Sequence, residues 1–366
     1  MNRTSAHLTA SRYRMFFLAA MFVIAVPGFS QSNGKTTDQV YKNIQVLKAV
    51  PAEQLIPAMQ FITASLGVDC DFCHVSGAFE KDDKKPKQTA RKMMLMMFAI
   101  NRDNFDGRQA VTCNSCHRGG QKPMAVPVIA EENSTVQGSS QGPQPSLPSA
   151  EQIVDRYVQS VGGSSAVQGI NSRVAEGKIE IAGRAFPVNL FYESPDKSST
   201  VIHLSNGDNI STFNGGYGWI VFPDQPTREM QQHELDGARI DGDLHLPLDL
   251  QRIFGELHVN GEDTIAGHAA YAITASKETR PTAQLYFDKE SSLLLRLVRY
   301  WDTPLGRYPV QTDFFDYRES EGLKIPFKWI VARPSARFTI QLERVRQNVS
   351  IERSRFAKPA VSASTH

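Results

Sequence analysis

The chain has 366 residues, of which 41% are hydrophobic and 21% are charged. This is the composition of an ordinary globular protein, long enough for about two domains, and it excludes collagen-like, coiled-coil and wholly disordered chains. The formal net charge is +2, but residues 1–30 hold three arginines and no acid, and the rest carries 37 basic and 38 acidic residues. A near-neutral chain gives no electrostatic reason to expect nucleic acid as a partner.

The N-terminus has the pattern of an export signal. Arg12 and Arg14 precede an apolar run from Met15 to Val26, and small residues follow near Ser30. This order is typical of a secretory signal peptide, so we expect residues 1–30 to be removed and the protein to be periplasmic or otherwise exported. The alternative is an uncleaved anchor that leaves the protein membrane-associated, for which the run is short, since a spanning helix needs about 17–25 residues.

Residues 36–122 predict a small, mostly helical domain that contains every cysteine of the chain. An apolar stripe over residues 51–65 predicts one helix, with Gly67 just past its end, and a second helix is expected over residues 90–101. The segment 123–148 is rich in Gly, Ser, Gln and Pro and has no apolar period. Such a segment cannot bury a core, so we expect a flexible linker there.

Residues 149–358 predict a second domain in which strands dominate. Ser149 and Gln152 have the spacing of a capping box, which predicts a helix at its start. Asn-Gly pairs at 206–207 and 214–215 predict hairpins. Alternating apolar residues predict strands in three further segments: 186–192, 325–331 and 338–342. The expected fold is therefore α+β and multidomain, with a small, mostly α-helical domain followed by an antiparallel β-sheet domain with a few helices.

All four cysteines lie in two copies of one motif, Cys-x-x-Cys-His. The copies are Cys70-Asp71-Phe72-Cys73-His74 and Cys113-Asn114-Ser115-Cys116-His117. At this spacing two thiols on one helical turn can form thioethers with the vinyl groups of a haem, and the histidine then lies beneath the porphyrin as the proximal iron ligand. We therefore expect two covalently attached haem c groups, whose irons are ligated by His74 and His117.

Three other uses of these cysteines fit the sequence less well. Zinc sites built from Cys-x-x-Cys pairs usually place the pairs about 15–20 residues apart, whereas about 40 residues lie between these two. A thioredoxin-like site needs a βαβ context that the helical pattern does not provide, and disulfides would leave both histidines without a role. Haem attachment needs reduced thiols outside the cytoplasm, which agrees with the export signal.

The ligand on the opposite side of each iron decides what the haems can do. Met59 lies on the apolar face of the first predicted helix, where it is either a core residue or the distal ligand of the first haem. The second predicted helix carries a cluster of methionines: Met93, Met94, Met96 and Met97. Such clusters usually pack a core, but Met96 and Met93 are also candidate ligands of the second iron, and the sequence does not choose between them.

Several segments around the motifs carry a family resemblance: Leu66–His74, Phe79-Glu80, Ala90-Arg91, Ile100-Asn101, Cys113–Gly119 and Lys122-Pro123. Over residues 40–125 the chain resembles the cytochrome c subunit of photosynthetic reaction centres, in the segment that carries that family's last two haems. The resemblance implies that Met59 ligates the first iron, and Met96 falls at a methionine that the motif shares. In four-haem members the second of these haems can take a distal histidine from an upstream segment that this chain lacks.

The predicted sheet domain is similar in architecture to the half-barrels of lipoprotein carriers and other periplasmic proteins that bind lipophilic molecules. This resemblance implies a curved, half-barrel-like sheet and admits a lipophilic ligand. Fold likeness does not by itself establish such a function.

Three functions agree with these patterns. The first is electron transfer with a redox protein partner, photosynthetic or respiratory, such as a membrane complex. The second is a haem-bearing binding or sensor protein whose β domain holds a lipophilic ligand or a protein partner. The third is a dihaem peroxidase, which needs one iron with an open or displaceable ligand. No other catalytic motif stands out, so we expect an electron carrier rather than an enzyme.

Five lysines lie between the haem motifs: Lys81, Lys84, Lys85, Lys87 and Lys92. They can steer an acidic redox partner or belong to a solvated loop. Because Asp82 and Asp83 interrupt the run, a solvated loop is the simpler interpretation.

Overall fold

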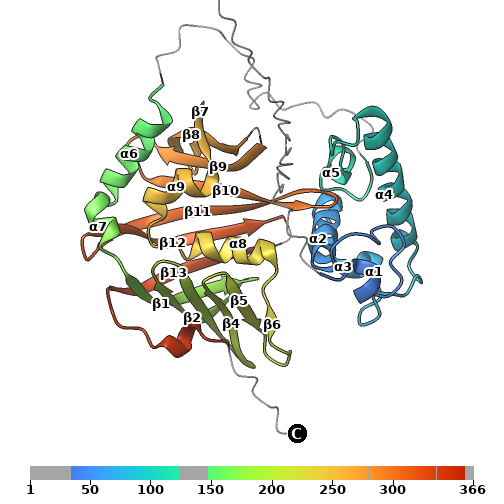
Figure 1. Ribbon diagram of the computed structural model, residues 1–366, viewed down its shortest axis with the longest axis horizontal. Coiled ribbons are helices and arrows are strands. Elements are labelled where there is room, and N and C mark those ends of the chain that lie inside the picture. The colour runs from blue at the N-terminus through green and yellow to red at the C-terminus, as the bar shows by residue number, and fades with distance from the viewer. Residues whose placement is uncertain (1–33, 124–146, 279, 335, 359–366) are drawn as a thin grey trace, which may run out of the picture.

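The computed structural model describes residues 34–123, 147–278, 280–334 and 336–358, and it divides into a helical unit and a sheet unit (Figure 1). The expected α+β architecture is confirmed. The predicted signal peptide and nearly all of the predicted linker lie outside the described residues. None of the helices in the described ranges has the length and apolar character needed to cross a membrane.

The helical unit is built from short helices around one long one. Its elements are α1 (Thr37–Val40), the 3₁₀ turn η1 (Ala52–Gln54), α2 (Leu55–Leu66), α3 (Cys70–Cys73), α4 (Lys85–Asn104) and α5 (Cys113–His117). The predicted helix over residues 90–101 is present but longer, because α4 begins at Lys85 with a proline in its first turn. Proline suits that position, since its missing N–H would have no helical partner there.

The end of α2 and the end of α5 approach each other closely. The Gly119 N–H donates to the Ser65 carbonyl at 2.9 Å. Gly67 ends α2 with a φ of +64°, and a Cβ there would lie 2.2 Å from the Gly119 oxygen. Only glycine meets both the left-handed conformation and the close contact. The backbone therefore joins the end of α2, just before the first Cys-x-x-Cys-His motif, to the residues just after the second.

The second unit is one 13-stranded sheet in which neighbouring strands are antiparallel, so β1 to β6 form one meander and β7 to β13 another. Its strands are β1 (Ser172–Ile181), β2 (Arg184–Glu193), β3 (Lys197–Leu204), β4 (Gly207–Asn214), β5 (Tyr217–Val221), β6 (Arg228–Glu229), β7 (Glu256–Ile265), β8 (His268–Lys277), β9 (Arg280–Asp288), β10 (Leu294–Thr303), β11 (Gly306–Ser320), β12 (Leu323–Arg333) and β13 (Ala336–Gln347). The hairpins predicted at the two Asn-Gly pairs join β3 to β4 and β4 to β5.

The order of the strands explains why helices cover one face of the sheet. The two meanders meet where β1 pairs with β13, which places β6 and β7 at opposite ends of the strand order. The chain must therefore cross the sheet to pass from β6 to β7, and it does so through α8 (Gln232–Asp241) and α9 (Leu246–Phe254) (Figure 1). The remaining helices of this unit are α6 (Ala150–Ser160), α7 (Ser164–Gln168) and the 3₁₀ turn η2 (Arg353–Phe356).

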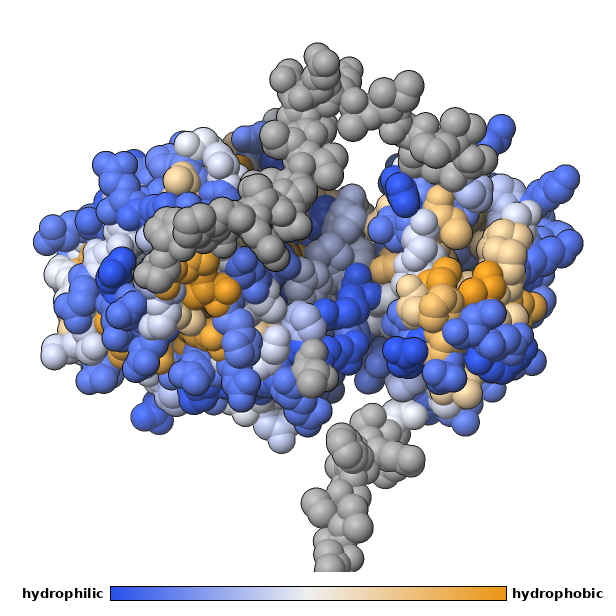
Figure 2. All heavy atoms as spheres, turned by 90° about the horizontal axis from the view of Figure 1, so that it is seen from above, coloured by the Kyte–Doolittle hydropathy of each residue, from blue (hydrophilic) through white to orange (hydrophobic). Residues whose placement is uncertain are grey.

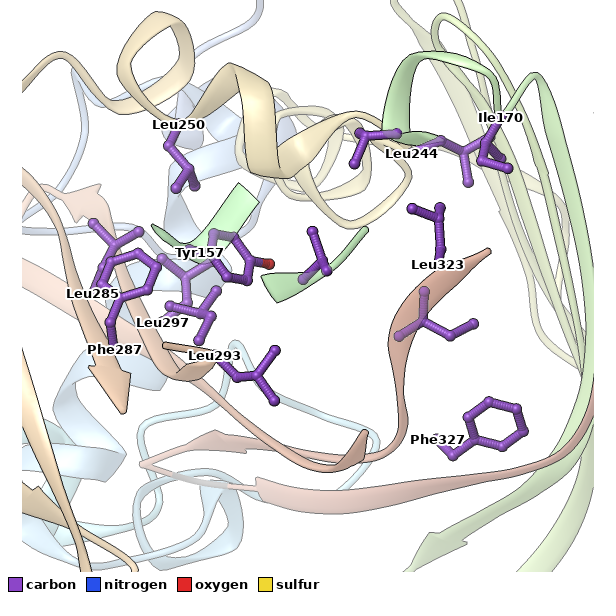
Figure 3. Close-up of a cluster of buried hydrophobic side chains, with 14 of the residues drawn as sticks. Tyr157, Ile170, Leu244, Leu250, Leu285, Phe287, Leu293, Leu297, Leu323 and Phe327 are labelled. Atoms are coloured by element: carbon purple, nitrogen blue, oxygen red, sulfur yellow. The ribbon is translucent and has the colours of Figure 1, made fainter. Parts of the chain in front are cut away.

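The main hydrophobic core lies between the sheet and these helices (Figure 3). The predicted capping box is confirmed, since the Gln152 N–H donates to the Ser149 hydroxyl at 3.2 Å and starts α6. Tyr157 of α6 packs its ring 5.3 Å from the ring of Phe287 on β9. Leu250 of α9 is buried in the same cluster. Helices α6 and α9 thus each contribute an apolar stripe to one face of the sheet.

The β10–β11 hairpin joins the two units (Figure 1). Leu305 and Tyr308 are buried, and both belong to the hydrophobic cluster of the helical unit, together with Phe61 of α2. At Gly306, where φ is +154°, a Cβ would lie 2.3 Å from the Phe61 ring. Gln109 of the helical unit donates to the Pro304 carbonyl at 2.7 Å. The hairpin therefore completes the core of the helical unit.

Replacing Leu305 by alanine tests this junction. Leu305 is fully buried, so Leu305→Ala is expected to lower the free energy of unfolding by about 2–5 kcal/mol, from lost burial and the cavity left behind. Denaturant unfolding of the purified protein measures the change.

The matched control is Tyr217→Ala, whose side chain is 73% exposed. It should change stability by no more than about 0.5 kcal/mol. Equal effects of the two substitutions would contradict a packed junction.

Candidate functional site

The second motif lies wholly in the short helix α5, whereas in the first motif α3 ends at Cys73 and His74 follows in an extended conformation. All four thiols are free, with Cys70 and Cys116 exposed. Cys73 and Cys113 are partly buried, and this burial raises the pKa of each thiol. No group of three or more His, Cys, Asp or Glu side chains that could hold a metal ion occurs among the described residues.

Both motif histidines are oriented by a backbone carbonyl. Nδ1 of His74 lies 2.9 Å from the Phe79 oxygen, and Nδ1 of His117 lies 2.9 Å from the Gly120 oxygen. A carbonyl oxygen only accepts hydrogen bonds, so in the neutral form of each ring Nδ1 carries the proton and Nε2 has the free lone pair. A histidine that ligates iron needs this tautomer and an orienting partner of this kind. The donor set of both motifs therefore fits a haem.

The surroundings of the motifs also suit a large apolar group. Several apolar side chains of the helical unit are exposed by a third or more: Ile56 by 49%, Phe79 by 57%, Met93 by 38%, Leu95 by 58% and Met96 by 47%. Figure 2 shows apolar side chains gathered on this unit among hydrophilic ones. Exposed apolar surface of this kind marks a place where a ligand or partner binds. A haem attached to the nearby thiols would cover part of it.

The candidate distal ligands take different positions on their helices. Met59 lies on α2, partly buried against the core of the helical unit. On α4, Met94 and Met97 are buried in that core, whereas Met93 and Met96 are on the exposed side. The interpretation of the methionine cluster as core packing therefore applies to Met94 and Met97. Met93 and Met96 stay available to a bound group.

The two motifs belong to one packed unit. The first motif helix, α3, lies against α4, and the second, α5, lies against both α2 and α4. Cys113 also packs against the hydrophobic cluster that the β10–β11 hairpin completes. Both motifs thus share α4 as support.

Lys87 is buried, contrary to the solvated loop expected for this run of charges. From the first turn of α4, its Nζ donates to the carbonyls of Phe79 at 2.8 Å, Glu80 at 2.9 Å and Lys81 at 2.8 Å. The same Nζ lies 3.1 Å from Asp82 Oδ1. Lys87 therefore fixes the loop whose carbonyl orients His74.

Arg91 and Asn101 hold the loops before and after α4, a role that local pattern did not reveal. Arg91 pairs with Asp82 at 2.8 Å and donates to the Asn43 carbonyl at 3.1 Å. The buried Asn101 side chain donates to the Val111 carbonyl at 2.7 Å and accepts from the Val111 N–H at 2.9 Å. Both residues lie in segments that carry the family resemblance, which is the signal that could have found them.

Two cavities are of note, and the first borders the second motif through Asn114. One, of about 410 Å³, lies at the junction of the units and is lined by Phe61, Thr112 and Arg307 among others. The other, of about 180 Å³, lies between the sheet and the segment joining α8 to α9. Its walls are mainly apolar, with Leu190, Leu297 and Trp329 among its lining residues.

Asp82 gives the first motif loop a pH-dependent stability. Its hydrogen bonds with Arg91, and then with Asn43 and Lys87, hold the pKa of this carboxyl well below its usual range. The folded-state pKa is depressed, so the stabilisation is present above the unfolded pKa of about 3.9 and is lost as pH falls through the folded pKa. We expect the wild type to lose more stability than Asp82→Asn between pH 5 and pH 2.

Urea unfolding of both proteins across this range measures the difference. Asp224→Asn, at an exposed carboxyl on the sheet unit, is the control. Parallel acid profiles for the wild type and Asp82→Asn would contradict the assignment.

Comparison with known proteins bears on the helical unit. A family model described as the photosynthetic reaction centre cytochrome C subunit matches residues 6–153. The reaction center cytochrome c subunit of Thermochromatium tepidum is 34% identical over 98 residues, which are 26% of this chain and 24% of that protein. Cytochrome c-554 of Chloroflexus aurantiacus is 33% identical over 82 residues, 20% of each chain. The chain thus spans about a quarter of the length of the curated relatives that it matches.

Solved structures resemble the sheet unit in fold alone. A DUF1329 family protein from Desulfovibrio piger has 15% identity and a TM-score of 0.40, covering 57% of this chain and 96% of its own. A LolA superfamily protein from Nitrosomonas europaea has 10% identity and a TM-score of 0.39, covering 58% of this chain and 99% of its own. The family resemblance predicted from the two motifs is confirmed: over residues 6–153 the chain carries a domain of the photosynthetic reaction centre cytochrome C subunit family.

Proposed function

We propose that the protein is an exported c-type cytochrome with two covalent haems, and that it transfers electrons. The observation that carries this proposal is the state of the two histidines. Each has Nδ1 on a backbone carbonyl and Nε2 free, directly after a pair of free thiols. Cys70 and Cys73 would hold one haem and Cys113 and Cys116 the other, with His74 and His117 as proximal ligands. When bound, haem supplies an iron that gains and loses one electron.

The chain's own part in this function is to orient and enclose the two centres. The carbonyls of Phe79 and Gly120 fix the imidazole rings, so little reorganisation accompanies the change of charge. A thioether on the distal side raises the potential relative to a second histidine. Met59 is our candidate for the first haem, and Met96 or Met93 for the second.

The proposed partner is another redox protein, such as a membrane complex. Of the five lysines between the motifs, Lys87 is buried and Lys84 donates to the Asp71 carbonyl. Lys81, Lys85 and Lys92 are exposed. These three are therefore the lysines that can steer an acidic partner to the first haem.

The alternative is a haem-bearing binding protein whose sheet holds a lipophilic ligand. The cavity of about 180 Å³ under α8 and α9 favours it, because its walls are mainly apolar. Binding of a fluorescent fatty acid to the purified protein, abolished by Leu190→Trp in the cavity wall, would support this role. If the protein transfers electrons but binds no fatty acid, electron transfer is its supported role and the binding role is not supported.

Haem content is the first test of the proposal. The exported protein should carry the mass of two haems, and its pyridine haemochrome spectrum should be that of haem with both vinyl groups saturated. Cys70→Ala/Cys73→Ala and Cys113→Ala/Cys116→Ala should each lose one haem, because thioether attachment requires both thiols of a motif. A colourless product at the mass of the bare polypeptide would contradict the proposal.

Carbon monoxide distinguishes a carrier from a peroxidase. With a methionine on the distal side of each iron, the reduced wild type should not change its absorbance when the gas is added. Met59→Ala should leave the distal site of the first iron open to carbon monoxide. The absorbance should then change by the amount expected for one of the two haems. Ile56→Ala is the matched control, because Ile56 lies one turn earlier on α2 and is 49% exposed. It should show no absorbance change with carbon monoxide. If one haem of the wild type changed its absorbance fully with carbon monoxide, a peroxidase would be favoured over an electron carrier.

A further inference from the structure

The carbonyl that orients the first proximal histidine has a second donor. The Phe79 oxygen lies 2.9 Å from His74 Nδ1 and also accepts from Lys87 Nζ at 2.8 Å. One donor is a neutral imidazole N–H and the other an ammonium group. The oxygen can accept both because it has two lone pairs, and the charged donor makes the stronger hydrogen bond.

The ammonium group is fixed in place. Lys87 is 9% exposed, and its Nζ also donates to the carbonyls of Glu80 and Lys81. The anion that faces it is Asp82, which Arg91 also pairs with at 2.8 Å. Two cations therefore share one carboxylate.

The second motif lacks this arrangement. His117 Nδ1 lies 2.9 Å from the Gly120 oxygen. In the part of the chain that the structure describes, no lysine or arginine side chain donates to that carbonyl. The Nδ1 hydrogen bonds of the two histidines therefore have the same length, but their acceptor oxygens differ in strength.

We propose that Lys87 is a positioning residue that raises the redox potential of the first haem through the Phe79 carbonyl. An orienting carbonyl that binds Nδ1–H firmly makes the imidazole a better electron donor to iron. Lys87 draws electron density from that oxygen, so the Nδ1–H bond weakens and His74 donates less. A weaker donor stabilises ferric iron less, and the fixed positive charge acts in the same direction. The inference rests on the proposed haem attachment.

The test is a spectroelectrochemical titration of the full haem-loaded chain, which measures the reduction potential of each haem. Each potential is assigned to its haem with the variant that lacks the thiols of the other motif. Lys87→Gln keeps an N–H donor but removes the charge. It should lower the reduction potential of the first haem and leave that of the second haem unchanged within experimental error. Lys87→Arg keeps the charge and should restore most of the wild-type value.

Asp82→Asn is the matched variant, because it loosens the same loop but removes the opposite charge. It should shift the first couple to higher potential. If Lys87→Gln and Asp82→Asn shift that couple in the same direction, or if Lys87→Gln leaves it unmoved, Lys87 only supports the loop and the inference is wrong. Absence of any haem couple in the wild type would instead overturn the proposed function.

Lys87→Met provides a second removal of the charge if Lys87→Gln yields too little protein. It should lower the first couple at least as far as Lys87→Gln, since it also removes the donor to the loop. Retention of the wild-type potential in Lys87→Met would equally overturn the inference.

Discussion

Two backbone carbonyls are the constraint on which the proposed haem centres depend. The oxygens of Phe79 and Gly120 decide which nitrogen of each histidine is left free. Neither oxygen is held by a regular helix or strand, so other contacts must fix it. Lys87 holds the first loop, and the contact between Gly119 and Ser65 holds the second. The orientation of each ring therefore depends on a few polar contacts outside the motif.

The helical unit obtains part of its core from the sheet. A unit of fewer than about 100 residues buries a limited apolar surface, and its hydrophobic cluster includes Leu305 and Tyr308 from the β10–β11 hairpin. The hairpin packs against α2, the helix that also carries Met59. The sheet thus supports the element that presents a candidate iron ligand. The two units are distinct in fold but not independent in packing.

Local signals in the sequence predicted much of the fold. The Ser149 capping box, the two Asn-Gly hairpins and the alternating strands are confirmed because each depends on neighbouring residues. The start of α4 was missed because its first turn is polar and shows no apolar stripe. The pairing of β1 with β13 and the crossing by α8 and α9 are non-local, so no short pattern encodes them.

The sequence predicts which side chains form the candidate site, but not which groups hold those side chains in place. The spacing of cysteines and histidines identifies the motif, because attachment requires those residue types at those positions. Phe79 and Gly120 act through backbone oxygens, which every residue has, so their identity carries no signal. Lys87 stands in a run of charges, and only the folded loop shows that its ammonium group is enclosed by carbonyls.

The pairing of the first strand of the sheet with the last has a consequence for folding during synthesis. β1 is synthesised before the other strands of the sheet, but one of its two neighbours, β13, is the last of them. Until β13 arrives, one side of β1 presents unpaired backbone groups, which are prone to pair with other chains. Closing the sheet also brings together segments that are far apart in sequence, which slows folding. A chaperone that shields nascent strands would therefore have its greatest effect on the yield of this protein before residue 347 has been synthesised.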